Sequence, residues 1–203
     1  MSNTPLPKAV LFDMDGVLVD ARDWHYQALN QALGHFGMEI DYHTHLTVYD
    51  GLPTKVKLQL LTENKGLPKD LHDLINSLKQ IYTIRLTYIN CKPIFNVIQL
   101  VKYLSNKNIK IAVCSNSIKS TIEAMMDLSN LTPMIDLILS NEDVSKSKPD
   151  PEIYNKAMQF FDLNPSECLI FEDSDHGIKA AKASGANLKI VTCPEDLNIN
   201  LLK

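Results

Sequence analysis

Two aspartates at the end of a short apolar run are the residues of this sequence best suited to chemistry. Asp13 and Asp15 stand at alternate positions after the apolar residues 10–12, and Gly16 follows them. The apolar run predicts a buried strand, and the glycine predicts that the chain turns there. Ligands of open α/β sheets bind beyond the carboxyl ends of the strands. Two adjacent carboxylates repel unless a cation or a shared proton offsets the repulsion, so the pair predicts a metal-assisted site.

Three further groups of polar residues each follow another expected element of the same sheet. Ser115 and Asn116 come just before a helix start, where free backbone N–H groups favour an anion. Lys148 precedes a proline, and Glu172 and Asp173 end a fourth apolar run. Carboxylates at two strand ends, with hydroxyls and a lysine at two others, suit Mg²⁺ together with a phosphoryl group.

The elements that must position these residues alternate between strand and helix from about residue 92 onward. Apolar runs predict further strands at residues 109–114, 135–139, 169–171 and 188–191. Helices are expected from Pro93, over 118–128, after a capping Asp150 with Pro151 at the first helical position, and over 178–184. This alternation predicts an α/β fold, a Rossmann-like parallel sheet with helices on both faces.

Residues 20–87 carry no convincing strand pattern. Their clearest signal is a helical stripe at Leu71, Leu74, Ile75, Leu78, Ile81 and Tyr82. We therefore expect a separate helical domain inserted at residues 18–90, with residues 1–17 and 91–203 forming an α/β catalytic core.

The bulk composition is that of a soluble globular protein. The 203 residues are 45% hydrophobic and 22% charged, with a net charge of −4, which does not favour nucleic acid or a membrane surface as partner. The four cysteines lack zinc-ligand spacing, and no signal peptide or membrane span is evident. We expect a cytoplasmic monomer.

The four polar groups resemble the four motifs of the haloacid dehalogenase superfamily. They are residues 13–18, Ser115-Asn116, Lys148-Pro149-Asp150-Pro151 and Glu172-Asp173-Ser174-x-x-Gly177-Ile178, in the order of that superfamily. The resemblance runs from about residue 8 to about residue 191. A helical insert directly after the first motif is similar to the cap of the β-phosphoglucomutase-like branch.

The resemblance implies a phosphoryl-transfer mechanism. In it, Asp13 attacks phosphorus and forms a phosphoaspartate, and Asp15 protonates the leaving oxygen and later activates water. Lys148 would offset negative charge, and Ser115 would bond the phosphoryl oxygens. The substrate contacts that it implies in the core are Gly16, Ser115, Asn116 and Lys148.

The same resemblance implies a Mg²⁺ site. A carboxylate oxygen of Asp13, the backbone carbonyl of Asp15 and the carboxylate of Asp173 would bind the ion. Glu172 would lie outside these ligands or bind the ion through water.

The insert offers weaker candidates. His25, Thr54 and Lys55 are candidate substrate contacts. His43 and His45 would lie on one side of an extended segment and form a minor candidate for a metal pair.

These features favour a Mg²⁺-dependent phosphatase that hydrolyses a small phosphorylated metabolite, with sugar phosphates as the first expectation and the insert acting as a lid. The alternative is a β-phosphoglucomutase-type mutase, although Thr54 with Lys55 beside it stands where those mutases carry an arginine. Dehalogenation is disfavoured by Asp15, and phosphonate cleavage would need Lys55 or Lys57 as a Schiff base. A non-catalytic binding protein is the least favoured alternative.

Overall fold

The computed structural model describes residues 6–202, and the chain divides into two compact units. One unit comprises the residues up to Asp20 together with those from Lys92 onward, and the other comprises Ala21–Cys91. Each unit has a hydrophobic core of its own. No helix among residues 6–202 is both long and apolar enough to cross a membrane.

The first unit is built on a five-stranded parallel sheet with the strand order β3-β2-β1-β4-β5. The strands are β1 (Ala9–Phe12), β2 (Lys110–Cys114), β3 (Leu137–Leu139), β4 (Cys168–Glu172) and β5 (Asn187–Ile190). All residues of β1 and β4 are buried, as expected for parallel strands covered on both faces. The α/β prediction is confirmed.

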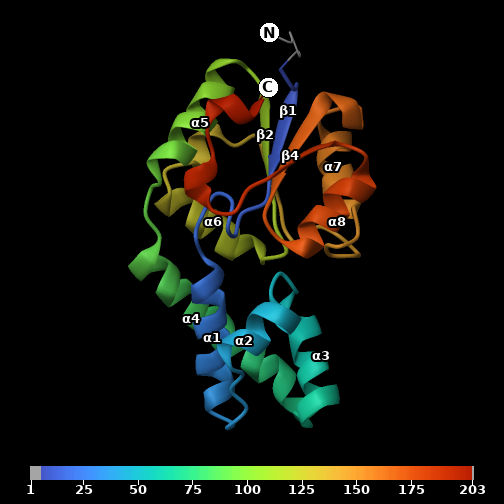
Figure 1. Cartoon of the computed structure of the whole chain (residues 1–203). Coiled ribbons are helices and arrows are strands. Elements are labelled where there is room, and N and C mark those ends of the chain that lie inside the picture. Colours follow the sequence, from blue (N-terminus) through green and yellow to red (C-terminus); the bar gives the residue numbers. More distant parts are fainter. Residues whose placement is uncertain (1–5, 203) are drawn as a thin grey trace. The chain divides into compact units, whose positions relative to one another are not determined.

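Four helices cover the two faces of this sheet, α5 and α6 on one side and α7 and α8 on the other (Figure 1). They are α5 (Phe95–Asn106), α6 (Lys119–Leu128), α7 (Glu152–Phe160) and α8 (Asp175–Ser184). Alternate residues of the central strands, such as Leu11 and Ile170, pack with Ile153 of α7 and Ala180 of α8. Short 3₁₀ turns occur at Thr132–Met134, Pro165–Glu167, Pro194–Asp196 and Ile199–Leu202.

Several predicted boundaries in this unit are displaced by one to three residues. The helix expected from Pro93 begins at Phe95, and the strand expected from residue 135 begins at Leu137. The cap of α7 is Pro151 rather than Asp150, but the Asp150 carboxylate still accepts a hydrogen bond from the Glu152 N–H, at 3.0 Å.

The second unit is entirely helical. It contains α1 (Arg22–Gly34), α2 (Tyr42–Thr44), a π-helix at His45–Tyr49, α3 (Thr54–Lys65), a 3₁₀ turn at Lys69–Leu71 and α4 (His72–Asn90). Its core contains Leu29 and Leu33 of α1, Leu58 and Leu61 of α3, and Ile75 of α4.

The interpretation of His43 and His45 as a pair on an extended segment is wrong. The Asp41 carboxylate caps α2 by accepting a hydrogen bond from the Thr44 N–H, at 2.9 Å, so the segment is helical. His43 is exposed on α2, whereas His45 is buried at the start of the π-helix. Residues two apart on a helix do not face the same side, so the two rings do not form a metal pair.

Candidate active site

The sheet register brings three of the candidate segments to one level. Phe12 pairs with Val113 of β2 on one side and with Phe171 of β4 on the other. The residues that follow Phe12, Val113 and Phe171 are Asp13, Cys114 and Glu172, so these three also lie at one level of the sheet. The Asp13 N–H donates to the Phe171 carbonyl at 3.0 Å, which continues the β1–β4 pairing to the nucleophile candidate itself.

The loop after β1 is compact because Gly16 allows a tight turn. Gly16 has a φ of 86°, a conformation that costs other residues roughly 1–2 kcal/mol. Its N–H donates to the Val19 carbonyl at 2.7 Å, and the Leu18 N–H donates to the Met14 carbonyl at 2.9 Å. The loop holds Asp15 where its Oδ2 accepts a hydrogen bond from the Ser117 hydroxyl at 3.2 Å.

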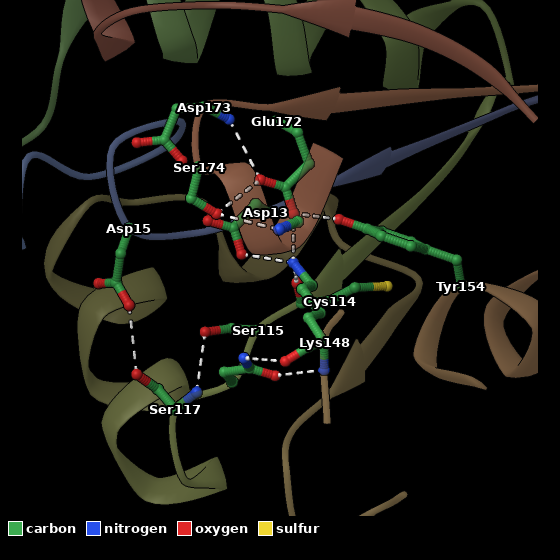
Figure 2. A network of polar contacts seen from close by, with 12 residues as sticks. Asp13, Asp15, Cys114, Ser115, Ser117, Lys148, Tyr154, Glu172, Asp173 and Ser174 are labelled. Carbon is green, nitrogen blue, oxygen red and sulfur yellow. Dashed lines mark hydrogen bonds and ion pairs between the residues drawn. The ribbon is translucent and has the colours of Figure 1, made fainter. Parts of the chain in front are cut away.

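The ammonium group of Lys148 lies at the centre of the site, and its side chain is only 3% exposed. It donates to Asp13 Oδ1 at 2.7 Å, to Glu172 Oε1 at 2.6 Å and to the Cys114 carbonyl at 2.8 Å (Figure 2). An ammonium group has three protons, and each has an acceptor here. Lys148 is thereby fixed between the two carboxylates.

Asn116 holds the backbone on which Lys148 is carried. Its Oδ1 accepts from the Lys148 N–H at 3.1 Å, and its Nδ2 donates to the Lys148 carbonyl at 3.3 Å. Ser115, just before it, is buried, and its hydroxyl oxygen accepts from the Ser117 N–H at 3.0 Å. The second motif therefore positions Lys148 as well as presenting polar groups of its own.

The carboxylate of Glu172 is fully buried and saturated with donors. Oε1 accepts from Lys148 and from the Tyr154 hydroxyl, the latter at 2.5 Å. Oε2 accepts from the Asp173 N–H at 3.1 Å and more weakly from the Ser174 hydroxyl at 3.4 Å. This pattern fits a residue that organises its neighbours better than one that binds a metal directly.

The negative charge of the site exceeds its positive charge. The pKa of Asp13 is raised well above its usual value, chiefly because the carboxyl group is buried. The ammonium of Lys148 opposes that rise. The carboxylates of Glu172, Asp173 and Asp15 add to it. Burial by itself would lower the pKa of Lys148, but the charges of Asp13 and Glu172 outweigh it and raise the pKa above its usual value.

The cluster of acids has the composition of a divalent-cation site. One carboxylate oxygen from each of Asp13, Glu172 and Asp173 lies within 4.8 Å of the others. Hard cations such as Mg²⁺ prefer oxygen ligands of this kind. An added positive charge would also offset the repulsion that raises the pKa of Asp13.

The structure brings together the candidates from the four motifs, all of which belong to the first unit. The candidate substrate contacts from the insert, His25, Thr54 and Lys55, belong to the second unit. His25 Nδ1 lies 3.4 Å from the ammonium of Lys79, Thr54 begins α3, and Lys55 is exposed on α3.

Sequence reasoning missed two side chains of the network. Ser117 lies next to the predicted site residues Ser115 and Asn116, and its hydroxyl group is the feature that could have marked it as a third site residue. Tyr154 lies on the inward face of α7, where its spacing resembles that of a core residue. Figure 2 shows both of them directed at the acids that they contact.

Known proteins resemble this chain over most of its length. The model of the haloacid dehalogenase-like hydrolase family matches residues 10–191. A Saccharomyces cerevisiae protein named as a probable pseudouridine-5'-phosphatase is 30% identical, over 96% of this chain and 86% of the relative. The Escherichia coli fructose-1-phosphate phosphatase YqaB is 27% identical, over 87% of this chain and 92% of the relative.

A solved structure shows the same fold. The crystal structure of β-phosphoglucomutase from Clostridium difficile has a TM-score of 0.85 and 21% identity, covering 97% of this chain and 96% of that one. The family match spans all four motifs. The chain therefore belongs to the haloacid dehalogenase-like hydrolase family.

Proposed function

We propose that this protein is a Mg²⁺-dependent phosphatase that hydrolyses a small phosphorylated metabolite through a phosphoaspartate on Asp13. The observation that carries the proposal is the buried contact of Lys148 with Asp13, at 2.7 Å, beside a cluster of further carboxylates. A lysine fixed in this way can neutralise charge shared by an attacking carboxylate and a phosphoryl group.

The first half of the reaction transfers the phosphoryl group to the protein. The Asp13 carboxylate attacks phosphorus, and the bond from phosphorus to the ester oxygen breaks. Asp15 gives its proton to that leaving oxygen, while the Ser117 hydroxyl orients the Asp15 side chain. Lys148 stays paired with Asp13 throughout, and Ser115 bonds the phosphoryl oxygens.

The second half releases inorganic phosphate. Water attacks the phosphorus of the phosphoaspartate, and Asp15 accepts the proton of that water. The bond from phosphorus to Asp13 then breaks, which restores the Asp13 carboxylate. One residue serves as acid and then as base because the two steps are near mirror images.

The residues that would bind Mg²⁺ are Asp13 and Asp173 through their side chains and Asp15 through its backbone carbonyl. Glu172 would act outside them, because both of its oxygens already accept hydrogen bonds. The cation would supply charge neutralisation at the phosphoryl group.

The substrate class is supported by the relatives. The yeast and Escherichia coli proteins are named as phosphatases of a nucleotide-like and a sugar phosphate. We propose a small organic phosphate monoester of these kinds as the substrate.

The test is phosphate release from a panel of sugar phosphates and nucleoside monophosphates, with Mg²⁺ and with a chelator. We expect release only with Mg²⁺, and we expect Asp13→Asn to reduce kcat at least about 1000-fold, since it removes the nucleophile. Asp175→Asn, at an exposed aspartate in the first turn of α8, is the matched control and should retain activity. Release that persists in Asp13→Asn would contradict the assignment. Conversion of glucose 1-phosphate to glucose 6-phosphate without release would indicate a mutase.

A further inference from the structure

Tyr154 is a fully buried tyrosine in direct contact with the candidate site, and the proposed reaction gives it no role. It lies on α7, and its hydroxyl donates to Glu172 Oε1 at 2.5 Å. Its ring lies 4.8 Å from the Lys148 ammonium, within the range of a cation–π contact. Tyr154 therefore contacts both partners of the Glu172–Lys148 ion pair.

The donor count at Glu172 shows what the hydroxyl does. Oε1 accepts from Lys148 and Tyr154 together, so the tyrosine satisfies part of the charge that would otherwise attract the ammonium alone. The same ammonium is shared with Asp13 Oδ1. A hydrogen bond to a charged group in a buried site is strong. The balance of Lys148 between the two carboxylates therefore depends on the Tyr154 hydroxyl.

The backbone around Glu172 leaves it little freedom to adjust. Oε2 accepts from the Asp173 N–H, and a Cβ placed on Gly177 would lie 1.8 Å from Oε1. The carboxylate is thus held by the Asp173 N–H, the Tyr154 hydroxyl and the Lys148 ammonium, and Gly177 leaves no room for a side chain beside it. Loss of one of these donors is expected to act mainly on the Lys148 ammonium, because Glu172 shares it with Asp13.

We propose that Tyr154 is a positioning residue for phosphoryl transfer, which acts through Glu172 to keep the Lys148 ammonium on Asp13. The inference rests on the proposed function, because it assigns Tyr154 a part in that reaction. Without the hydroxyl, Lys148 is drawn toward Glu172, and Asp13 loses part of the positive charge that balances it during attack. The effect falls on the chemical step more than on substrate binding.

The test is a double-mutant cycle of Tyr154→Phe and Glu172→Gln, measured as phosphate release in Mg²⁺. We expect Tyr154→Phe to lower kcat about tenfold and to change KM less than about threefold. In the Glu172→Gln background the same change should cost less than about twofold, because the partner through which it acts has been altered. Rates are divided by the folded fraction from circular dichroism.

The matched control is Tyr103→Phe on α5, which removes the hydroxyl of a half-buried tyrosine in the same unit. It should keep the wild-type kcat. If Tyr154→Phe does not fold, Tyr154→Met, which also lacks the hydroxyl but fills the space with a flexible side chain, is expected to show the same loss of kcat.

The outcomes separate this inference from the proposed function. An active wild type with an unchanged kcat in Tyr154→Phe, whatever its melting temperature, would show that the hydroxyl is only structural. Equal losses in the wild-type and Glu172→Gln backgrounds would show that Tyr154 does not act through Glu172. A wild type that releases no phosphate from any substrate would overturn the proposed function and this inference with it.

Discussion

At the scale of single residues, the site is organised by a buried lysine and the carboxylates that compete for it. Lys148 uses its three protons on Asp13, Glu172 and the Cys114 carbonyl. Asp13 directly follows β1, and Cys114 and Glu172 are the last residues of β2 and β4, so the three acceptors lie at the same level of the sheet. Small shifts of one carboxylate are therefore passed to the others through the lysine.

Gly177 gives a sharp test of this arrangement. A Cβ at this position would meet the Glu172 carboxylate at 1.8 Å, closer than atoms can approach. We expect Gly177→Ala to displace Glu172 and to lower kcat by about tenfold or more, because Lys148 follows its partner.

The measurement is the rate of phosphate release per folded protein, with Gly34→Ala as the control. Gly34 ends α1, and the atoms nearest to its added Cβ belong to the flexible side chain of Glu39, the first at 3.1 Å. Wild-type activity in Gly177→Ala would show that Glu172 moves without consequence.

At the scale of elements, the sequence predicts the site better than it predicts the segments around it. The runs that became β1, β2 and β4 are apolar except for Lys110 at the start of β2 and Glu172 at the end of β4. The polar residues at their carboxyl ends fall on one edge because the strands are parallel. The sequence pattern by itself therefore predicts that the motif residues lie in one site.

The features that the sequence does not predict also have physical explanations. A tyrosine on the inner face of a helix has the spacing of a core residue. The hydrophobic periodicity of α7 therefore does not predict the contact of Tyr154 with Glu172. The polar residues around His43 and His45 have no apolar helical stripe, so the pattern predicts an extended segment, whereas the Asp41 cap makes it helical. The strand order depends on long-range pairing, which local patterns do not encode.

The π-helix of the second unit carries a prediction on pH. His45 is buried there, and its pKa is lowered to about 4, chiefly by burial and then by the charge of Lys57. The further charges acting on it are His25, which lowers the pKa, and Asp50 and Asp23, which raise it.

The sign of the effect follows from proton uptake. Below the ordinary pKa of 6.5 the unfolded chain protonates His45 while the folded chain does not, so stability falls as the pH falls from about 6.5 to about 4. We expect His45→Phe to remove about 1–2 kcal/mol of the loss in unfolding free energy between about pH 7.5 and about pH 5. Urea unfolding at both pH values measures it, with exposed His43→Phe as the control. Identical pH slopes for His45→Phe and the wild type would contradict the prediction.

At the scale of the whole molecule, the chemistry is concentrated in one of two units. The residues of all four motifs lie in the unit that contains the sheet, and the helical unit carries the candidate substrate contacts His25, Thr54 and Lys55. The boundaries expected at residues 17–18 and 90–91, and the role of the helical unit as a lid, remain predictions.

The surplus of negative charge predicts a measurable gain from a divalent cation. We expect saturating Mg²⁺ to raise the melting temperature of the protein by about 5 °C, because the ion binds only the folded acidic cluster. Asp173→Ala should abolish most of this shift, and Asp175→Ala, at an exposed neighbour outside the cluster, should keep it. Scanning calorimetry with and without Mg²⁺ makes the comparison. An equal shift in both variants would remove Asp173 from the proposed ligands.

The position of β1 in the sheet has a consequence for how the chain folds during synthesis. β1 ends at Phe12, yet it lies between β2, which begins at Lys110, and β4, which begins at Cys168. The middle strand is therefore translated long before either neighbour, and contacts so distant in sequence form slowly. The ribosome must add about 160 further residues after Asp13 before Glu172, the other carboxylate that Lys148 contacts, has been synthesised. The nascent chain is thus expected to acquire its catalytic geometry as one of its last folding events.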